Sequence, residues 1–244
     1  MRLTEHVCCI GGGTLGYGIS DAYDCNIYAL RCGSEYVLID SGAGMDSDCV
    51  IANMQQDCIQ PEQVSALILT HAHADHSGGA QELRRRLQLR VLAGELTAAI
   101  VSTGDERRMG LVGAREAGVY PASYQFPPCP VDEQLKIDSI VRIGGVELHI
   151  LPAPGHSADM LVVYRPDIGA LFAGDAIFSG GKLAVLNTPD YDEAQYKETI
   201  RRLNALPIEQ LFSGHGTAVL EDAQAPLRVA QDRFDQGMKP WSIV

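Results

Sequence analysis

The sequence lacks the long apolar run that a membrane-spanning helix would need. No stretch approaches about 20 consecutive apolar residues. The first residues also lack a signal-peptide pattern, because Glu5 and His6 stand where an apolar stretch would be required. We therefore expect a cytoplasmic protein that does not bind membranes.

Basic residues are scarce as well. The chain has 19 lysines and arginines against 31 aspartates and glutamates, which gives a formal net charge of −12. A surface with that charge repels polyanions, so nucleic acid is a poor partner and nuclease activity is disfavoured. We expect a small-molecule substrate instead, and the sequence leaves the oligomeric state open.

The seven cysteines include no C-x-x-C motif, and their number is odd. This pattern disfavours both a secreted disulfide framework and a zinc-finger site. We expect reduced and mostly buried thiols.

Apolar runs and turn residues predict an alternation of strands and helices, which indicates an α/β chain. The expected strands cover residues 26–32, 36–40, 64–70, 90–94, 139–151 (as a hairpin), 160–165, 170–175 and part of 208–216. The expected helices cover residues 46–58, 78–89, 192–206 and about 221–236. No break in composition marks a domain boundary, so we predict a single domain over residues 1–244.

The segment 95–134 differs from the rest because it mixes charge, glycine, proline and aromatic residues. One or two short helices and a long loop are expected there. Such a segment inside a compact domain is more often a functional lid than a linker. We predict that it forms part of a substrate pocket and is more mobile than the sheets.

The sequence THAHADHSGG (70–79) directly follows an apolar run and holds three of the seven histidines. In an extended chain His71 and His73 point the same way, and Asp75 and His76 then turn with the loop toward a neighbouring site. Imidazole nitrogen and carboxylate oxygen bind zinc and other divalent metals. The pattern therefore indicates a metal site; the alternative is a polar helix cap with accidental histidines.

Three later segments could supply further ligands: APGHS with His156, FAGD with Asp175 and SGHG with His215. Each lies in a loop of small residues after an apolar run, where the backbone can approach a metal closely. Each is weak evidence alone, since an aspartate at a strand end is usually a turn residue. Together, and in this order after the histidine cluster, they are strong evidence.

With VLIDSG (37–42) upstream, these motifs resemble the metallo-β-lactamase superfamily over about residues 36–216. The resemblance implies a four-layer αββα sandwich of the α/β class, with metals at one edge between the sheets. It implies that His71, His73 and His156 hold one metal, that Asp75, His76 and His215 hold a second, and that Asp175 bridges both. Asp40 would order the metal loop; the alternative is an ordinary turn aspartate.

The same resemblance implies a metal-dependent hydrolase. A hydroxide held by two divalent metals would attack a small ester, thioester or lactone, and Asp75 would orient it as a catalytic residue. Zinc is the expected metal, with iron and manganese as alternatives. For substrate contacts, Phe178 and Lys182 are candidates; Lys182 could reach an anionic substrate, although a solvated lysine is the alternative.

Differences between this sequence and the family pattern narrow the choice of substrate class. Asp175 as a bridging carboxylate counts against antibiotic hydrolysis, yet a β-lactamase-type amide hydrolase stays an alternative. Phe178 stands where homoserine lactonases often carry a proton-donating tyrosine, which favours a thiolate leaving group and hence a thioester. The short segment after His215 argues against a thioester, since it leaves no room for the glutathione-binding helices of hydroxyacylglutathione hydrolases.

Two other classes stay open. A persulfide dioxygenase of this superfamily would hold a single iron, so metal content separates it from a two-zinc hydrolase. A non-catalytic relative would keep the fold only for binding. The complete set of seven ligands argues against that second alternative.

Overall fold

The computed structural model describes residues 1–186, 188 and 190–243. The chain divides into two compact units. Unit 1 comprises Met1–Leu135 and Ile143–Val146, and unit 2 comprises Lys136–Arg142 and Glu147–Val244. The single domain over residues 1–244 stays a prediction.

Unit 1 is built on a six-stranded sheet in the order β1-β2-β3-β4-β5-β6. The strands are β1 (Val7–Gly11), β2 (Ile27–Cys32), β3 (Glu35–Ile39), β4 (Val64–Leu69), β5 (Arg90–Gly94) and β6 (Glu133–Leu135). The first three pair antiparallel, whereas β3 to β6 run parallel. Because parallel neighbours end at the same edge, the residues that follow β3 and β4 emerge side by side.

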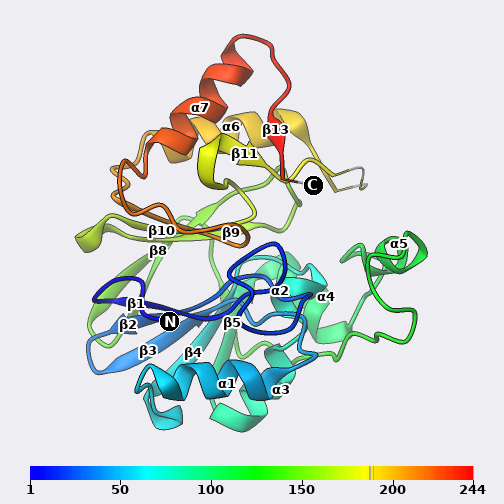
Figure 1. The fold of residues 1–244 in the computed structure, drawn as a ribbon, viewed down its shortest axis with the longest axis vertical. Coiled ribbons are helices and arrows are strands. Elements are labelled where there is room, and N and C mark those ends of the chain that lie inside the picture. The colour runs from blue at the N-terminus through cyan, green and yellow to red at the C-terminus, as the bar shows by residue number, and fades with distance from the viewer. Residues whose placement is uncertain (187, 189, 244) are drawn as a thin grey trace. The chain divides into compact units, whose positions relative to one another are not determined.

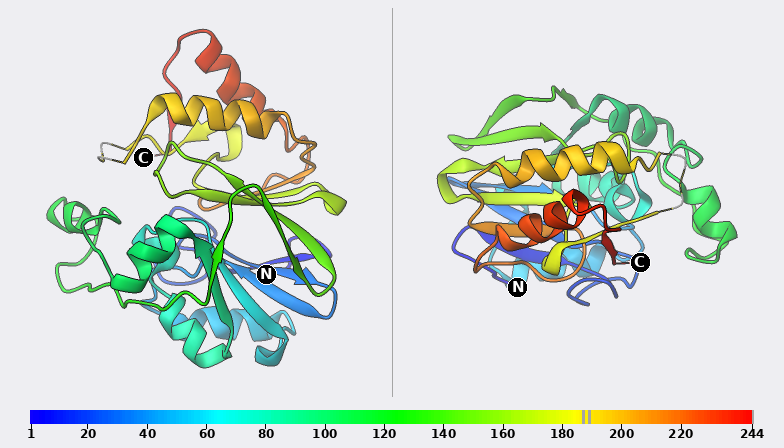
Figure 2. Two further views of the ribbon diagram at one scale, coloured as in Figure 1. Left: turned by 180° about the vertical axis from the view of Figure 1, so that it is seen from behind. Right: turned by 90° about the horizontal axis from the view of Figure 1, so that it is seen from above.

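The helices of unit 1 are α1 (Ser47–Gln56), α2 (Ala74–Ser77), α3 (Ala80–Leu87), α4 (Glu95–Thr103) and α5 (Leu111–Glu116), with a 3₁₀ turn η1 (Pro61–Gln63). Helices α1 and α3 lie along one face of the sheet, whereas α5 stands away from it (Figures 1 and 2). On α3 the residues Ala80, Leu83 and Leu87 are spaced three and four apart and form its buried face. The two helices α4 and α5 confirm the short helices expected within residues 95–134.

Unit 2 holds a five-stranded sheet in the order β12-β10-β9-β8-β7. Its strands are β7 (Ser139–Ile143), β8 (Val146–Pro152), β9 (Leu161–Arg165), β10 (Ala170–Gly174) and β12 (Gln210–Ser213); a separate pair joins β11 (Lys182–Leu183) to β13 (Trp241–Ser242). The expected hairpin is present as β7 and β8. Strand β10 pairs antiparallel with β9 and parallel with β12, so β10 and β12 also end at one edge.

The helices of unit 2 are α6 (Glu193–Asn204) and α7 (Ala225–Asp235), with 3₁₀ turns η2 (Pro166–Ile168) and η3 (Ser179–Gly181). Helix α6 begins after Asp192, whose carboxylate accepts hydrogen bonds from two backbone N–H groups of the first turn. Helices α6 and α7 lie together over one face of the sheet (Figure 1). Tyr196, Ile200 and Leu227 are fully buried in the core between these elements.

All seven cysteines are free thiols, and five of them are buried. Most of the thiols are thus buried, as expected. Among the described residues, every helix falls short of the length and apolar character that crossing a membrane would require.

Candidate metal centre

Asp40 anchors the loop that carries the histidine cluster in unit 1. It follows β3 directly and adopts a left-handed backbone conformation with φ of 62°, which aspartate tolerates better than most residues. Its side chain is buried, and Oδ1 accepts a hydrogen bond from the backbone N–H of Thr70 at 2.8 Å. Its Oδ2 accepts another from the Thr70 hydroxyl at 2.8 Å. Asp40 therefore fixes the start of the loop that follows β4.

The same network fixes the orientation of two imidazoles. Because the Thr70 hydroxyl donates its proton to Asp40, it accepts a hydrogen bond from Nδ1 of His71 at 3.0 Å. Nδ1 of His76 donates to Oδ2 of Asp40 at 2.9 Å. Both rings thus carry their proton on Nδ1 and their lone pair on Nε2. A carboxylate that holds a histidine in this way is a usual support of metal-binding histidines.

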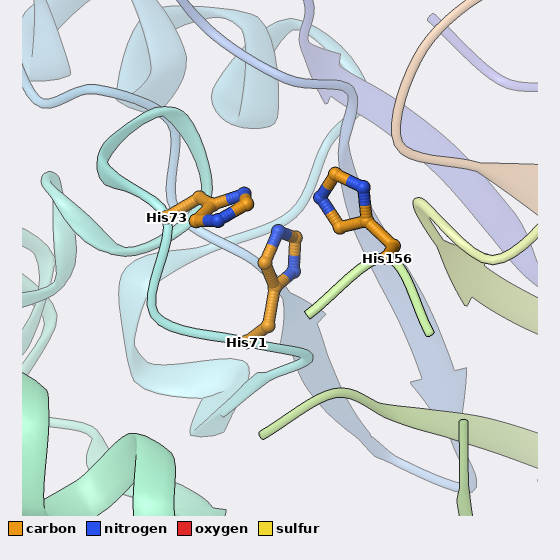
Figure 3. A group of neighbouring side chains, drawn as sticks. All are labelled: His71, His73 and His156. Atoms are coloured by element: carbon orange, nitrogen blue, oxygen red, sulfur yellow. The ribbon is translucent and has the colours of Figure 1, made fainter. Parts of the chain in front are cut away.

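The other two predicted ligands of unit 1 lie within this cluster. Figure 3 shows the rings of His71 and His73 on the same side of their loop, and their centroids are 4.6 Å apart. Oδ2 of Asp75 lies 3.6 Å from Nε2 of His76. Two ligands of one tetrahedral ion, each about 2.1 Å from it, lie about 3.4 Å apart. The four residues His71, His73, Asp75 and His76 are therefore grouped as ligands would be.

The local backbone differs from the sequence-based expectation in one respect. Asp75 and His76 were expected in a loop, but they lie on the helical turn α2, which begins directly after His73. The helical turn reverses the chain within four residues, so that Asp75 and His76 return toward the end of β4. His71 lies between the end of β4 and α2, close to the strand end as expected.

Cys25 lies beside this cluster and was not anticipated from any motif. Its thiol and the ligand atoms of Asp40 and His76 lie within 4.8 Å of one another. Its backbone N–H donates to the carbonyl oxygen of Asp75 at 3.1 Å. Burial raises the pKa of the Cys25 thiol, so the residue stays neutral and packs against the cluster.

In unit 2, helix α6 holds the loop that carries His156. The hydroxyl of Thr199 donates to the carbonyl oxygen of Pro154 at 2.7 Å, and the carbonyl of Gly155 accepts from the backbone N–H of Asp192 at 2.9 Å. Nδ1 of His156, which is also labelled in Figure 3, lies 3.3 Å from the carbonyl oxygen of Ala184. A carbonyl can only accept, so this ring also carries its proton on Nδ1 and its lone pair on Nε2.

Asp175 and His215 follow β10 and β12, the parallel neighbours of unit 2. Oδ2 of Asp175 lies 3.7 Å from Nε2 of His156 and 3.6 Å from Nε2 of His215. The carbonyl oxygen of Asp175 accepts a hydrogen bond from the hydroxyl of Tyr196 at 2.5 Å, which ties the strand end to α6. All three predicted ligands of unit 2 are buried and meet around one carboxylate oxygen.

The two candidate substrate contacts, Phe178 and Lys182, differ in exposure. The side chain of Phe178 is buried, and its ring centroid lies 6.1 Å from that of His215. Its backbone N–H donates to the carbonyl oxygen of Lys182 at 3.0 Å, and the Lys182 side chain is exposed. Phe178 therefore packs beside a predicted ligand. A direct contact of either residue with substrate stays a prediction.

Replacing Gly155 with alanine is expected to lower the free energy of unfolding by about 2–4 kcal/mol. Gly155 has φ of 138°, and a Cβ atom there would lie 2.4 Å from Cα of Tyr196. Gly180 is a matched control, because its φ is 73° and nothing lies within 4 Å of a Cβ at that position. We expect Gly180→Ala to cost only about 1–2 kcal/mol. Equal losses for the two variants in urea denaturation would contradict the close packing of α6 on the His156 loop.

Comparison with known proteins identifies a family and several relatives of this chain. The sequence model of the metallo-beta-lactamase superfamily matches residues 20–215. An atrochrysone carboxyl ACP thioesterase of Aspergillus fumigatus is 26% identical over 85% of this chain and 55% of its own length. A hydroxyacylglutathione hydrolase of Cereibacter sphaeroides is 29% identical over 62% of this chain and 48% of its own. The chain thus spans about half the length of these two relatives.

A third relative and two solved structures match over most of both chains. A probable metallo-hydrolase of Bacillus subtilis is 25% identical over 78% of this chain and 80% of its own. A metallo-beta-lactamase from Pontibacter korlensis has a TM-score of 0.68 at 22% identity and covers 95% of this chain and 96% of its own. A protein solved in a di-iron-bound form has a TM-score of 0.67 at 28% identity and covers 85% of this chain and 95% of its own. These structures confirm the α/β metallo-β-lactamase fold.

The matched region 20–215 includes all seven predicted metal ligands. Two of these relatives are themselves named as a thioesterase and a hydrolase, in line with the expectation of an enzyme. The histidine and aspartate clusters of the two units agree with the use of divalent metals in this superfamily. The chain belongs to the metallo-β-lactamase superfamily.

Proposed function

We propose that the protein is a dinuclear metal-dependent hydrolase of a small carbonyl substrate, with a thioester favoured over an ester or lactone. One observation carries this proposal: the seven predicted ligands form one group in each unit, and hydrogen bonds orient the imidazoles of His71, His76 and His156. In the proposed centre the first metal takes His71, His73 and His156, the second takes Asp75, His76 and His215, and Asp175 bridges. Membership in the superfamily supports the proposal that the ligands of unit 1 and those of unit 2 form one centre.

The donor atoms fit divalent metals. Imidazole nitrogen and carboxylate oxygen are ligands of zinc, iron and manganese. The rings of His71, His76 and His156 carry their protons on Nδ1, so each has its lone pair on Nε2. Zinc is our proposal for the metal, and the di-iron-bound relative makes iron the alternative. When bound, such metals lower the pKa of water toward about 7 and polarise a carbonyl group.

The chain's own residues decide the nature of the leaving group. Asp75 is partly exposed, so its carboxylate can accept a proton from an attacking water and orient it. Phe178, packed beside His215, has no hydroxyl that could protonate a leaving group. A thiolate leaves without such help, because the pKa of a thiol is only about 8.5. One relative is named a thioesterase, which supports the same class of substrate.

Three expectations from the sequence accompany this proposal. The net charge of −12 supports a small-molecule substrate rather than nucleic acid. We propose a cytoplasmic location, and we propose that segment 95–134 forms one wall of the substrate pocket. The mixed charge and aromatic content of that segment supports its role in binding.

The proposal predicts faster hydrolysis of a thioester than of the oxygen ester with the same acyl group. Purified protein loaded with zinc would be tested anaerobically on matched thioesters, esters, lactones and a β-lactam, with thiol or acid release as the readout. Hydrolysis without dioxygen and with two zinc ions per chain is the expected result. Turnover that needs dioxygen and one iron per chain would move the assignment to a persulfide dioxygenase. Cleavage of the β-lactam alone would move it to an amide hydrolase.

A further inference from the structure

The hydroxyl of Tyr196 joins two separate segments of unit 2. Tyr196 lies on α6, and its side chain is fully buried. Its hydroxyl donates to the backbone carbonyl oxygen of Asp175 at 2.5 Å and accepts from the backbone N–H of Ala184 at 3.4 Å. The direction of both bonds is fixed, because a carbonyl oxygen can only accept and an N–H group can only donate. One phenol therefore connects the end of β10 with the residue that follows β11.

Each of these two segments positions a predicted metal ligand. Asp175 directly follows β10, and its Oδ2 lies 3.7 Å from Nε2 of His156. The carbonyl oxygen of Ala184 lies 3.3 Å from Nδ1 of His156 and accepts its proton. A continuous series of hydrogen bonds thus runs from the imidazole of His156 through Ala184 and Tyr196 to the backbone of Asp175.

Packing holds Tyr196 in place on two sides. The backbone before His156 lies directly against α6, since a Cβ atom at Gly155 would lie 2.4 Å from Cα of Tyr196. The ring of Tyr191 packs edge-on to that of Tyr196, with centroids 6.1 Å apart. Because both the main chain and the ring are held, the hydroxyl of Tyr196 stays directed at its two backbone partners.

We infer that Tyr196 is a positioning residue for both His156 and Asp175. Its hydroxyl holds Ala184, whose carbonyl keeps the proton of His156 on Nδ1 and leaves the lone pair on Nε2. The same hydroxyl fixes the backbone from which the side chain of Asp175 extends. The role toward a metal rests on the proposed function, whereas the hydrogen bonds themselves do not.

Tyr196→Phe tests this inference, because it removes the hydroxyl and keeps the packed ring. Tyr164→Phe is the matched control: Tyr164 is also buried in unit 2, and its hydroxyl also donates to a backbone carbonyl, that of Pro207 at 2.8 Å. Pro207 precedes β12, whereas the predicted ligand His215 follows it. Zinc affinity would be measured by competition with a chromophoric chelator. We expect Tyr196→Phe to weaken zinc binding by about 10–100-fold and Tyr164→Phe to leave it within about twofold.

A second readout works on the metal-free protein. The nitrogen-15 shifts of the His156 ring, measured at about pH 8, where an ordinary imidazole is neutral, show which nitrogen carries the proton. We expect Nδ1 to carry it in the wild-type protein and in Tyr164→Phe, and the ring of Tyr196→Phe to exchange between both tautomers. Unchanged His156 shifts in Tyr196→Phe, or equal losses of zinc affinity in the two variants, would overturn the inference.

The wild-type protein supplies a test that does not require Tyr196→Phe to fold. The backbone amide of Ala184 is expected to exchange with solvent as slowly as the amides of β10, because its N–H is buried and bonded to Tyr196. Exchange as fast as at an exposed loop amide would also overturn the inference. If the wild-type protein binds no zinc while the His156 tautomer still changes in Tyr196→Phe, the proposed function fails and the positioning of His156 stands.

Discussion

Replacement of Asp175 by alanine is expected to abolish activity and to remove at least one of the two metals. Oδ2 of Asp175 lies 3.7 and 3.6 Å from the Nε2 atoms of His156 and His215, so this oxygen is central to the ligand set of unit 2. Its loss removes the anionic group that bridges the proposed centre. Stabilisation of several kcal/mol by the metals would be lost, which corresponds to a rate decrease on the order of 1,000-fold or more.

Asp167→Ala is the control for this variant. Asp167 also lies in unit 2, but its carboxylate is largely exposed and pairs with Arg165 at 2.8 Å. We expect this variant to keep both metals and its activity. Metal content by mass spectrometry and thiol release would be measured on both proteins. An Asp175→Ala variant that retains two metals and the wild-type rate would reject the bridging role.

Asp40→Ala is expected to lower the free energy of unfolding by about 3–5 kcal/mol and to weaken metal binding by about 10–100-fold. The substitution would leave two buried donors of Thr70 and the Nδ1–H of His76 without their acceptor. It would also place alanine at φ of 62°, which strains the backbone. Chemical denaturation and zinc competition would measure the two effects.

Asp40→Asn separates the effect of Asp40 on stability from its effect on metal binding. Asparagine tolerates the left-handed backbone, and its amide oxygen can still accept the N–H of Thr70. Its amide nitrogen cannot accept from His76, so the orientation of that ring would be lost. We expect a smaller loss of stability than for alanine, together with a loss of zinc affinity that is nearly as large. Wild-type zinc affinity in Asp40→Asn would show that Asp40 does not orient His76 for metal binding.

The ligand positions could be predicted because each is marked by a local pattern. His71 and His73 follow a nearly continuous apolar run, and such a run is typical of a strand buried in a parallel sheet. Asp175 and His215 stand at the ends of two further apolar runs, and the sheet pairs these strands in parallel. Residues at such strand ends meet at one sheet edge, so short motifs were sufficient to group them within a unit.

The supports of the site could not be predicted in the same way, because they depend on contacts between distant residues. Tyr120 stacks on Tyr23 across a long stretch of chain, and this contact leaves no periodic pattern in the sequence. Cys25 and His76 are far apart in the sequence, and their ligand atoms come within 4.8 Å of each other only in the folded chain. The two-residue strands β11 and β13 are also too short for a sequence pattern. Such features follow from tertiary packing rather than from local propensity.

The most direct test of the account is the rate of thiol release from a thioester as a function of zinc bound per chain, measured anaerobically. Metal-free protein would be titrated with zinc, and the rate recorded at each stoichiometry. The account predicts that the rate rises with the second equivalent and reaches its maximum at two zinc ions per chain. A maximum at one equivalent, or no thiol release at any stoichiometry, would contradict it.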